Sequence, residues 1–489
     1  MSPRFSVVIP TRERADTLRF ALRTCLDQSF DDYEVVVSDN HSSPATRSVV
    51  DETADPRVRY VRTPEPVAMS TNWEFAVGHA RGEHVLLIGD DDGLLPHALG
   101  ELDRLFRERA VPVIRWDAAY YTWPTVALPG QGGYLRVPLG RGTVERDAGA
   151  VIAAVAGFRE FYTELPMLYN AAVRRDVLDE LRTRSGRVFP HHVPDVYSGF
   201  AVAHAAGRFL SVAVPMTVSG QSRASNGIAS LFNRGRTDID REFFALNTRD
   251  GYRCEPSVPD LPVFPHAPVA DAFVFAKRTL FPHLPAELDR RALAVACVAG
   301  ARVAASEWPD ALATVRASLA DVPELVEWFD RELAGTPYHE LPPPRLRPDR
   351  MGGDGDVLHL DATAFGVCDV AGAAALCEQI LGYRRYGLSY YVGTSAGAAE
   401  RSELQEKESQ VRYLTRECAE LQEQLRRQHT AFTLHIEGQD ERLRVQEERL
   451  KRQDEVLAGQ RLRIVGLEKQ AQKGVIGRIA DLIRPRRAG

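Results

Sequence analysis

Residues 84–93, His-Val-Leu-Leu-Ile-Gly-Asp-Asp-Asp-Gly, place three consecutive aspartates directly after a short apolar run. A continuous apolar run of this length is typical of a strand that is buried on both faces of a parallel sheet. Ligands of open α/β sheets bind beyond the carboxyl ends of such strands. The stretch therefore predicts a strand that ends in an acidic cluster at a ligand-binding edge.

Four similar runs surround this one within the first 116 residues, and helical patterns separate them. Leu18, Leu22 and Cys25, for example, recur at helical spacing between the first two runs. This alternation predicts an α/β fold, a doubly wound and mostly parallel sheet covered by helices. The five predicted strands cover residues 5–9, 33–37, 58–61, 84–88 and 111–116.

The 489 residues allow about three folding units. Composition changes along the chain, and the proline run at 342–344 is typical of a linker. We expect an α/β domain over 1–230 and a helical region over 231–341, with helices at 287–305 and 310–333. A linker over 342–356 and a small unit of ambiguous structure over 357–398 should follow. The chain should then continue as a coiled coil over 399–472 and a basic amphipathic tail over 473–489.

The overall composition excludes several classes of protein. The 61 basic and 67 acidic residues give a net charge of −6, so no global basic surface for nucleic acid is expected. The six cysteines form no C-x-x-C pair, which disfavours a zinc cluster or a disulfide framework and fits a reducing cytoplasm. The first residues lack the regions of a signal peptide, and no run reaches roughly 18 apolar residues. We therefore expect a cytoplasmic protein.

Apolar residues recur every seven positions after residue 399, with a step of four in the middle. Such heptads with charged flanks predict a coiled coil and a homo-oligomer, although a lone solvated helix is the alternative. The tail at 473–489 is expected either to lie peripherally on the inner face of the cytoplasmic membrane, or to cap the coiled coil or fray. The heptad positions are Leu404, Val411, Cys418, Leu425 and Phe432, then Ile436, Leu443, Leu450, Leu457 and Ile464.

Polar residues gather where the predicted strands end, as in Pro10-Thr-Arg12 and Ser38-Asp-Asn40. No glycine follows the first strand, so the dinucleotide-binding and P-loop motifs are both absent there. Three adjacent aspartates repel one another unless a cation screens them, and a hard divalent metal would do so with oxygen ligands. The alternative is an acidic turn that caps the helix near Pro96.

Four segments resemble the family 2 glycosyltransferases with the GT-A fold. They are Val7-Val-Ile-Pro-Thr-Arg12, Tyr33-Glu-Val-Val-Val-Ser-Asp-Asn40, Asn72-Trp-Glu-Phe-Ala76 and Arg81-Gly-Glu-His-Val-Leu-Leu-Ile-Gly-Asp-Asp-Asp92. The resemblance is specific over residues 4–100 and extends to about 225. It implies inverting transfer of a sugar from a nucleotide-sugar donor, UDP- or dTDP-linked, with Mn²⁺ or Mg²⁺. The acceptor would be a glycan, a lipid-linked sugar or a small molecule, as in the synthesis of surface polysaccharide.

The resemblance also implies roles for particular residues. Asp92 is the leading metal ligand, with Asp91 as the second, although Gly89 stands where the family commonly has an aspartate. Arg223 would contact the donor phosphates from a later loop, in which Ser222 replaces the usual histidine. The nucleotide would be held by Pro10, Thr11, Arg12, Asp39, Asp90 and Asp91.

An inverting displacement needs a general base for the acceptor hydroxyl. The resemblance places this base at Asp195, which follows Pro194 and opens a helix-like segment. Asp195 is also a favourable N-cap, and His191 and His192 are rival bases by their ordinary pKa. A second hypothesis is a scaffold that keeps this fold without turnover and gathers glycan-assembly enzymes through its coiled coil.

Overall fold

The computed structural model describes residues 2–223, 225, 238–261, 263–342, 345–349, 351–354 and 356–389. They fall within one compact unit that spans Met1–Tyr390. The predicted coiled coil and basic tail lie outside the described residues. Within the described ranges, no helix combines the length and the apolar character that crossing a membrane requires.

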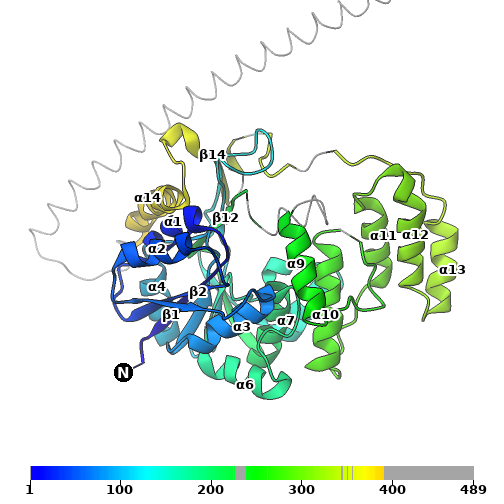
Figure 1. The fold of residues 1–489 in the computed structure, drawn as a ribbon, viewed down its shortest axis with the longest axis horizontal. Coiled ribbons are helices and arrows are strands. Elements are labelled where there is room, and N and C mark those ends of the chain that lie inside the picture. The colour runs from blue at the N-terminus through cyan, green and yellow to red at the C-terminus, as the bar shows by residue number, and fades with distance from the viewer. Residues whose placement is uncertain are drawn as a thin grey trace, which may run out of the picture. The chain divides into compact units, whose positions relative to one another are not determined.

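An eight-stranded sheet forms the core of this unit, in the order β3-β2-β1-β4-β10-β6-β11-β9. Its strands β1 and β2 are labelled in Figure 1. The first four strands in this order are parallel, whereas β10 is antiparallel to both β4 and β6. The α/β prediction is confirmed, and the five predicted strands lie within two residues of their expected ends. The bounds are β1 (Phe5–Thr11), β2 (Tyr33–Asp39), β3 (Val58–Arg62), β4 (His84–Leu87), β6 (Val113–Trp116), β9 (Thr143–Asp147), β10 (Ala171–Arg174) and β11 (Arg208–Val212).

Both faces of this sheet are buried under helices. Alternate side chains of a strand point to opposite faces, so Val7 and Ile9 of β1 join one apolar cluster and Val8 joins the other. The first cluster includes α1 (Ala15–Leu26), α2 (Pro44–Thr53) and α4 (Ala98–Glu108). The second includes α3 (Met69–His79), α5 (Ala148–Ala156), α6 (Arg175–Ser185) and α7 (Pro194–Ala206).

A second, six-stranded sheet has the order β13-β14-β8-β7-β12-β5. Its last strand, β5, directly follows the aspartate triplet, and β12 pairs with it. Helix α14 (Val370–Ser389) packs into the apolar core of this sheet. The segment from 357 that the sequence separates as a small unit thus joins this sheet through β14. The bounds are β5 (Gly93–Leu94), β7 (Ala119–Thr122), β8 (Tyr134–Pro138), β12 (Thr217–Gln221), β13 (Gly352–Asp354) and β14 (Val357–Asp361).

The helical region has its own apolar core, to which α10 contributes one face while its other face packs against α7. The single helix expected over 310–333 is wrong, because the chain turns between α12 and α13. Pro323 opens α13, and proline is favoured in a first helical turn but not within a helix. The bounds are α9 (Asp238–Arg249), α10 (His266–Thr279), α11 (Arg290–Gly300), α12 (Trp308–Ala317) and α13 (Pro323–Glu332), with short 3-10 helices at Tyr162–Glu164, Ala305–Glu307 and Ala362–Phe365.

His84 of β4 is an unusual polar residue of the sheet. It is 2% exposed and lies between the rings of Phe5 and Phe106, with centroids 5.5 and 3.9 Å away. Burial, and then the charge of Arg4, lower the pKa of His84 to about 4. The unfolded chain, with an ordinary pKa near 6.5, therefore takes up this proton more readily than the folded protein.

We expect His84→Gln to reduce the acid sensitivity of the fold. Because the folded-state pKa is depressed, His84 costs nothing above about pH 6.5 and destabilises the protein as the pH falls from there to about 4. The wild type should lose on the order of 3 kcal/mol more than His84→Gln between pH 7 and pH 4 in urea unfolding. His283→Gln, at an exposed histidine, should behave like the wild type; equal acid sensitivity in all three proteins would contradict the assignment.

Candidate active site

Parallel pairing brings the ends of β1, β2 and β4 to one edge of the main sheet. Thr11 and Asp39 are partners in register, and the chain that leaves β4 runs directly into the aspartate triplet. The Thr11 hydroxyl donates a buried 2.7 Å hydrogen bond to Asp90 Oδ2. The structure thus brings together three of the predicted nucleotide-binding residues.

A pocket at this edge is lined by residues of the β1–α1 turn, α3 and α9. Pro10, Thr11, Arg12 and Asp90 line it, as the sequence predicts for nucleotide-binding residues. The wall from α9 carries no sequence signal, because it comes from more than two hundred residues further along the chain. Lining residues to which the sequence assigned no role include Arg14, Asn40, Asn72, Tyr169, Glu242 and Phe243.

Arg12 and Asp39 are both engaged with protein partners. Arg12 forms an ion pair with Glu242 of α9 and donates a 2.6 Å hydrogen bond to the Asn40 carbonyl. Asp39 is fully buried, and its two oxygens accept hydrogen bonds from the Ser42 amide, the Tyr60 hydroxyl and Arg62. Arg12 therefore connects α9 to the sheet edge, and Asp39 lies behind the pocket wall.

Asp92 is held by backbone groups on both of its oxygens. The amides of Gly89 and Gly220 each donate a 2.7 Å hydrogen bond to it. Burial, and then the charge of Asp91, raise the pKa of Asp92 to about 7. The triplet does not cap the following helix, since the N-cap of α4 is His97. Asp92, which the sequence analysis expects to be the main metal ligand, therefore links the turn after β4 to β12 by hydrogen bonds.

The two carboxylate oxygens of Asp91 have different neighbours. One faces the loop that follows β12, and the other faces the guanidinium of Arg14. Its Oδ2 accepts hydrogen bonds of 2.7 and 2.5 Å from the hydroxyls of Ser222 and Ser225. Its Oδ1 lies 3.8 Å from Arg14 Nη1. The position where the family commonly has a histidine thus supplies a hydroxyl to this carboxylate. Arg223, between these serines, is exposed.

Asp90 pairs with Arg14, a residue that the sequence analysis does not name. Arg14 Nη1 lies 2.9 Å from Asp90 Oδ1, and the two side chains are 15% and 3% exposed. Burial opposes the charge of Arg14, but Asp90 and Asp91 outweigh it and raise the pKa of Arg14. Burial raises the pKa of Asp90 even against the charge of Arg14. Asp90 is therefore paired with an arginine that is largely buried.

Asp195 lies in the first turn of α7. Val193 is the N-cap and Pro194 the first helical residue, so Asp195 is not the cap. Its Oδ1 is buried and accepts no hydrogen bond from the residues that the structure describes. Burial raises the pKa of Asp195. A buried carboxylate oxygen without a donor is costly unless a ligand supplies one.

Two tyrosines lie close enough to Asp195 for its charge to act on them. After burial, the charges of Asp92 and Asp195 raise the pKa of Tyr169 most. Tyr169 also lines the pocket and packs edge-on against Trp73 at 4.8 Å. Burial, and then the charge of Asp195, raise the pKa of Tyr162. Tyr169 therefore lies within the fields of both acidic groups, and no local pattern in the sequence marks it.

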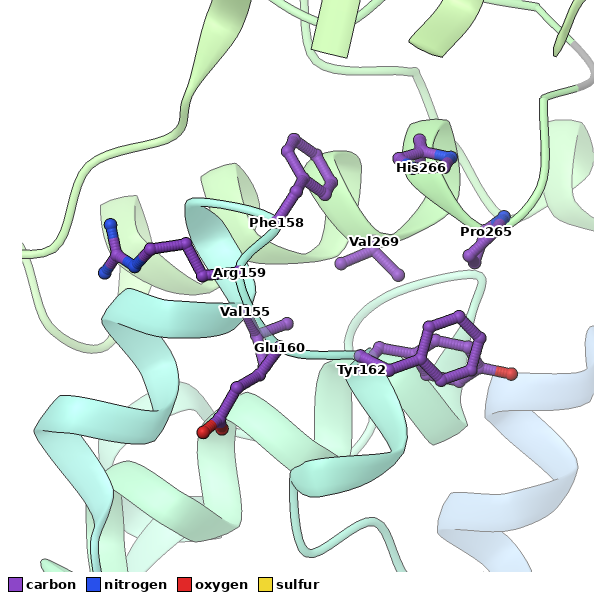
Figure 2. A pocket seen from close by; sticks show the side chains of 9 residues that line it. Val155, Phe158, Arg159, Glu160, Tyr162, Pro265, His266 and Val269 are labelled. Atoms are coloured by element: carbon purple, nitrogen blue, oxygen red, sulfur yellow. The ribbon is translucent and has the colours of Figure 1, made fainter. Parts of the chain in front are cut away.

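Tyr162 also borders a second hollow, between the end of α5 and the start of α10 (Figure 2). Phe158, Arg159, Glu160, Pro265, His266 and Val269 share its lining. Phe161, which belongs to the same lining, is 56% exposed. Phe158 has a φ of 51°, which is rare for a bulky side chain and marks local strain. The hollow is aromatic with a charged rim.

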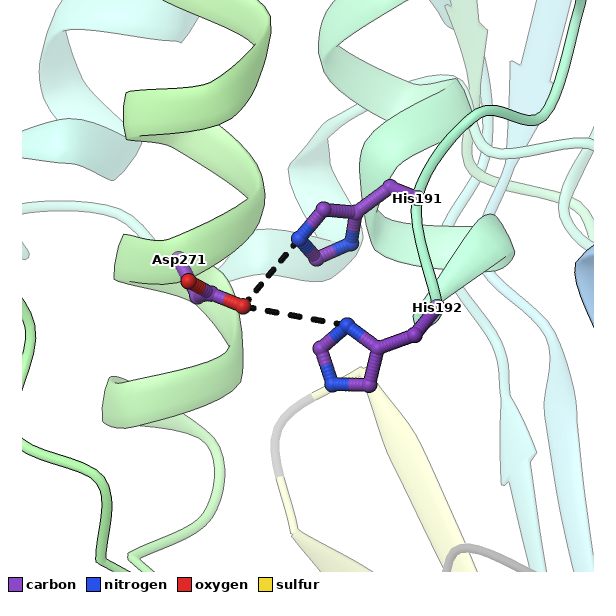
Figure 3. A group of neighbouring side chains, drawn as sticks. All are labelled: His191, His192 and Asp271. Atoms are coloured by element: carbon purple, nitrogen blue, oxygen red, sulfur yellow. Dashed lines mark hydrogen bonds and ion pairs between the residues drawn. The ribbon is translucent and has the colours of Figure 1, made fainter. Parts of the chain in front are cut away.

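His191, His192 and Asp271 have metal-binding side chains whose ligand atoms lie within 4.8 Å of one another (Figure 3). His191 Nε2 and His192 Nδ1 lie 3.1 and 3.7 Å from Asp271 Oδ2. However, the Val193 amide donates to His191 Nδ1, which places the proton of the neutral ring on Nε2, toward Asp271. A metal-bound Nε2 would need the opposite tautomer.

The hydrogen bonds of Asp271 identify this group as a buried brace. Its Oδ1 accepts from the Glu255 amide at 2.8 Å, and Oδ2 accepts from the Tyr252 hydroxyl as well as from His191. Although burial opposes ionisation, the hydrogen bonds from His191, the Glu255 amide and the Tyr252 hydroxyl lower the pKa of Asp271 to about 2. The brace connects α10 to the loop before α7. His191 is 1% exposed, and both of its ring nitrogens are engaged within the protein.

Residues 6–158 match a family model described as glycosyl transferase family 2. This match agrees with the resemblance carried by the motifs between residues 4 and 100, and it makes the N-terminal part of the chain similar to glycosyltransferases.

Individual proteins show the same similarity. Over 103 residues the chain is 36% identical to the GalNAc(5)-diNAcBac-PP-undecaprenol beta-1,3-glucosyltransferase of Campylobacter jejuni. This match covers 20% of this chain and 33% of that protein. A match of 31% over 109 residues, to an uncharacterised Mycobacterium tuberculosis protein, covers 22% of this chain and 34% of that one. The chain thus spans about a third of the length of these curated relatives.

A solved structure gives a looser similarity. Residues 1–349 of TarS from S. aureus, in complex with UDP-GlcNAc, align with a TM-score of 0.42 at 15% identity, over 66% of this chain and 83% of that one. Because this similarity is loose, the roles of residues here come from the geometry of this chain.

We expect Gly220→Ala to disrupt the triplet. A Cβ at Gly220 would lie 1.8 Å from the Asp91 carbonyl oxygen, so β12 must move away and release the Gly220 amide from Asp92. The loss of stability should be roughly 1–3 kcal/mol or more in urea unfolding. Gly78→Ala is the matched control, since open space surrounds that helical position. It should be neutral or stabilise by about 0.5–1 kcal/mol. A Gly220→Ala protein as stable as Gly78→Ala would refute this packing.

Proposed function

We propose that this protein is an inverting glycosyltransferase that moves a sugar from a nucleotide-diphosphate sugar to an acceptor hydroxyl, assisted by Mn²⁺ or Mg²⁺. The observation that carries the proposal is the Asp195 carboxylate, whose buried Oδ1 accepts no hydrogen bond within the described part of the chain, together with a pocket at the sheet edge that Asp90 lines. Tyr169 borders that pocket and is within the field of Asp195. An acceptor hydroxyl would supply the missing hydrogen bond.

The chain's own residues support a direct displacement. Asp195 accepts the proton of the acceptor hydroxyl while that oxygen forms a bond to the anomeric carbon. The bond from the anomeric carbon to the phosphate oxygen breaks on the opposite face, and the nucleoside diphosphate leaves. The buried position of Asp195 raises its pKa, which makes it a stronger base than an exposed aspartate.

The donor would occupy the pocket at the sheet edge. Pro10, Thr11 and Asp90 line it, and Asp39 directly precedes the lining residue Asn40 in the chain. We propose a UDP- or dTDP-linked donor, with Arg223 of the loop after β12 contacting the phosphates. Arg12 reaches the phosphates only if its ion pair with Glu242 opens.

Two carboxylates of the triplet suit a divalent cation. Asp90 Oδ1 and Asp91 Oδ1 both face Arg14, so these two carboxylates already hold a side-chain cation whose place a divalent ion would take. Asp92 suits it less, because both of its oxygens accept backbone hydrogen bonds. We therefore propose Asp91 as the first ligand, with Asp92 as a brace. The bound ion would offset the charge that develops on the leaving diphosphate.

The acceptor would approach from the side of Tyr162, where the aromatic hollow of Figure 2 begins. Exposed aromatic rings such as Phe161 offer a flat apolar face, and the rim residues Arg159 and Glu160 offer hydrogen bonds. This lining suits a glycan or a lipid-linked sugar. The name of the C. jejuni relative describes a glucosyltransferase that acts on an undecaprenol-linked glycan, which supports a role in the synthesis of surface glycans.

The second candidate is a scaffold without turnover, in which a coiled coil over 399–472 gathers partner enzymes. Its support is that Asp91 Oδ2 is already occupied by the hydroxyls of Ser222 and Ser225. Release of nucleotide from a panel of UDP- and dTDP-sugars, with and without Mn²⁺, separates the two. If no nucleotide is released and no metal-dependent nucleotide binding occurs, the enzyme is excluded.

The sequence pattern supports three further proposals. The protein forms homo-oligomers through residues 399–472, residues 473–489 contact the inner face of the membrane, and the protein is cytoplasmic.

We expect Asp195→Asn to lower sugar transfer by at least about 100-fold, since an amide cannot take up the proton. UDP binding, followed as a shift in Tm, should be unchanged. In the wild type, kcat should fall as the pH drops through a pKa above that of an ordinary aspartate, because the base must be ionised. Asp176→Asn is the matched control, at the same position of the first turn of the neighbouring α6. Transfer that survives in Asp195→Asn would exclude Asp195 as the base.

The assignment of metal ligands predicts different results for two neighbouring aspartates. Asp91→Asn should weaken Mn²⁺-dependent UDP binding about tenfold or more in calorimetry, with little loss of Tm. Asp92→Asn should instead lower Tm, because its amide nitrogen would face a backbone N–H. If Asp92→Asn keeps its Tm and loses Mn²⁺-dependent binding, Asp92 is the ligand as the sequence analysis expects.

A further inference from the structure

We infer that Arg14 is a resident cation of this site, which competes with a divalent metal ion for Asp90 and Asp91. The inference deepens the proposed function and rests on it only for the identity of the site. The guanidinium lies 2.9 Å from Asp90 Oδ1 and 3.8 Å from Asp91 Oδ1. It therefore occupies the position between two carboxylates that a metal ion would need.

The local backbone is built in a way that holds Arg14 in this position. Glu13, directly before it, has a φ of 53°, in the left-handed region that side chains other than glycine rarely adopt. The Glu13 amide donates to Ser42 Oγ at 2.9 Å, and the Glu13 carboxylate accepts from the Ser43 amide at 2.7 Å. Two hydrogen bonds thus hold a strained residue at the turn from which α1, with Arg14 as its N-cap, begins.

The two arginines of this turn differ in their surroundings. Arg12 pairs with Glu242, whose side chain is 50% exposed. Arg14 pairs with carboxylates that are 3% and 7% exposed. Ion pairs with buried carboxylates are screened little by solvent, whereas exposed pairs are weak. Arg14 is thus the arginine whose charge acts most strongly on the triplet.

A cation that is part of the chain changes how metal binds. A metal ion that enters the donor-free site must displace Arg14 from Asp90 and Asp91, which lowers the apparent affinity for the metal. A donor diphosphate offers Arg14 another anion, since a guanidinium matches phosphate oxygens. Binding of the nucleotide and binding of the metal should therefore favour each other reciprocally.

The test measures Mn²⁺ binding to the nucleotide-free full-length protein by calorimetry, and does not depend on turnover. Arg14→Gln removes the charge and keeps a hydrogen-bond donor for Asp90, so it should bind Mn²⁺ about tenfold or more tightly than the wild type. Arg14→Met, a second neutral variant, should show the same gain. Arg14→Lys keeps the charge and should bind Mn²⁺ like the wild type. Arg19→Gln, at an exposed position of α1, is the matched control and should also be unchanged.

Three results would overturn the inference. They are an unchanged or weaker Mn²⁺ affinity in the neutral Arg14 variants, no Mn²⁺ binding in any variant, or a gain that persists when Asp91→Asn is added. The last result would place the ion elsewhere, for example at His191 and Asp271. Hydrolysis of UDP-sugars by the wild type is measured separately. Its absence would refute the proposed function, and the competition for Mn²⁺ would still be decided by the calorimetry.

Discussion

Burial of β1, β2 and β4 on both faces is the constraint on which the site depends. With apolar clusters on either side of these strands, polar side chains find solvent or ligand only where the strands end. Parallel pairing puts those ends at the same edge, where Thr11 lies opposite Asp39 and donates to Asp90. The position of the pocket is thus a consequence of the topology of the sheet.

The same edge concentrates negative charge, and the structure resolves this repulsion differently for each aspartate. Asp92 is held by two backbone amides, which ties the turn to β12. Asp91 accepts from two serine hydroxyls. Asp90 pairs with the buried Arg14. Adjacent residues of one type therefore have separate structural and binding roles, because each points to a different partner.

The helical region, to which the sequence assigns no function, supports the site from two directions. Helix α9 supplies one wall of the pocket and a partner for Arg12. Helix α10 packs against α7, and its Asp271 holds His191 in the loop before Asp195. Position and burial of Asp195 thus depend on residues more than seventy positions further along the chain. The group of His191, His192 and Asp271 resembles a metal site in composition, but its hydrogen-bond donors make it a brace.

The sequence by itself determined five of the eight strands of the main sheet, the acidic edge and the place of Asp195 at the start of a helix. Each of these depends on local features, namely apolar runs, helical spacing and residues that follow a strand. It misplaced the boundary within 310–333, where the effect of Pro323 outweighs the helical pattern. Only the tertiary structure decided which partner each aspartate has, that Arg14 and not Arg12 faces the triplet, and that the charges of both the triplet and Asp195 act on Tyr169. The physical reason is that the contacts of Arg14 and Arg12 join residues 76 and 230 positions apart and depend on the direction in which a turn points its side chains, which no periodic pattern encodes.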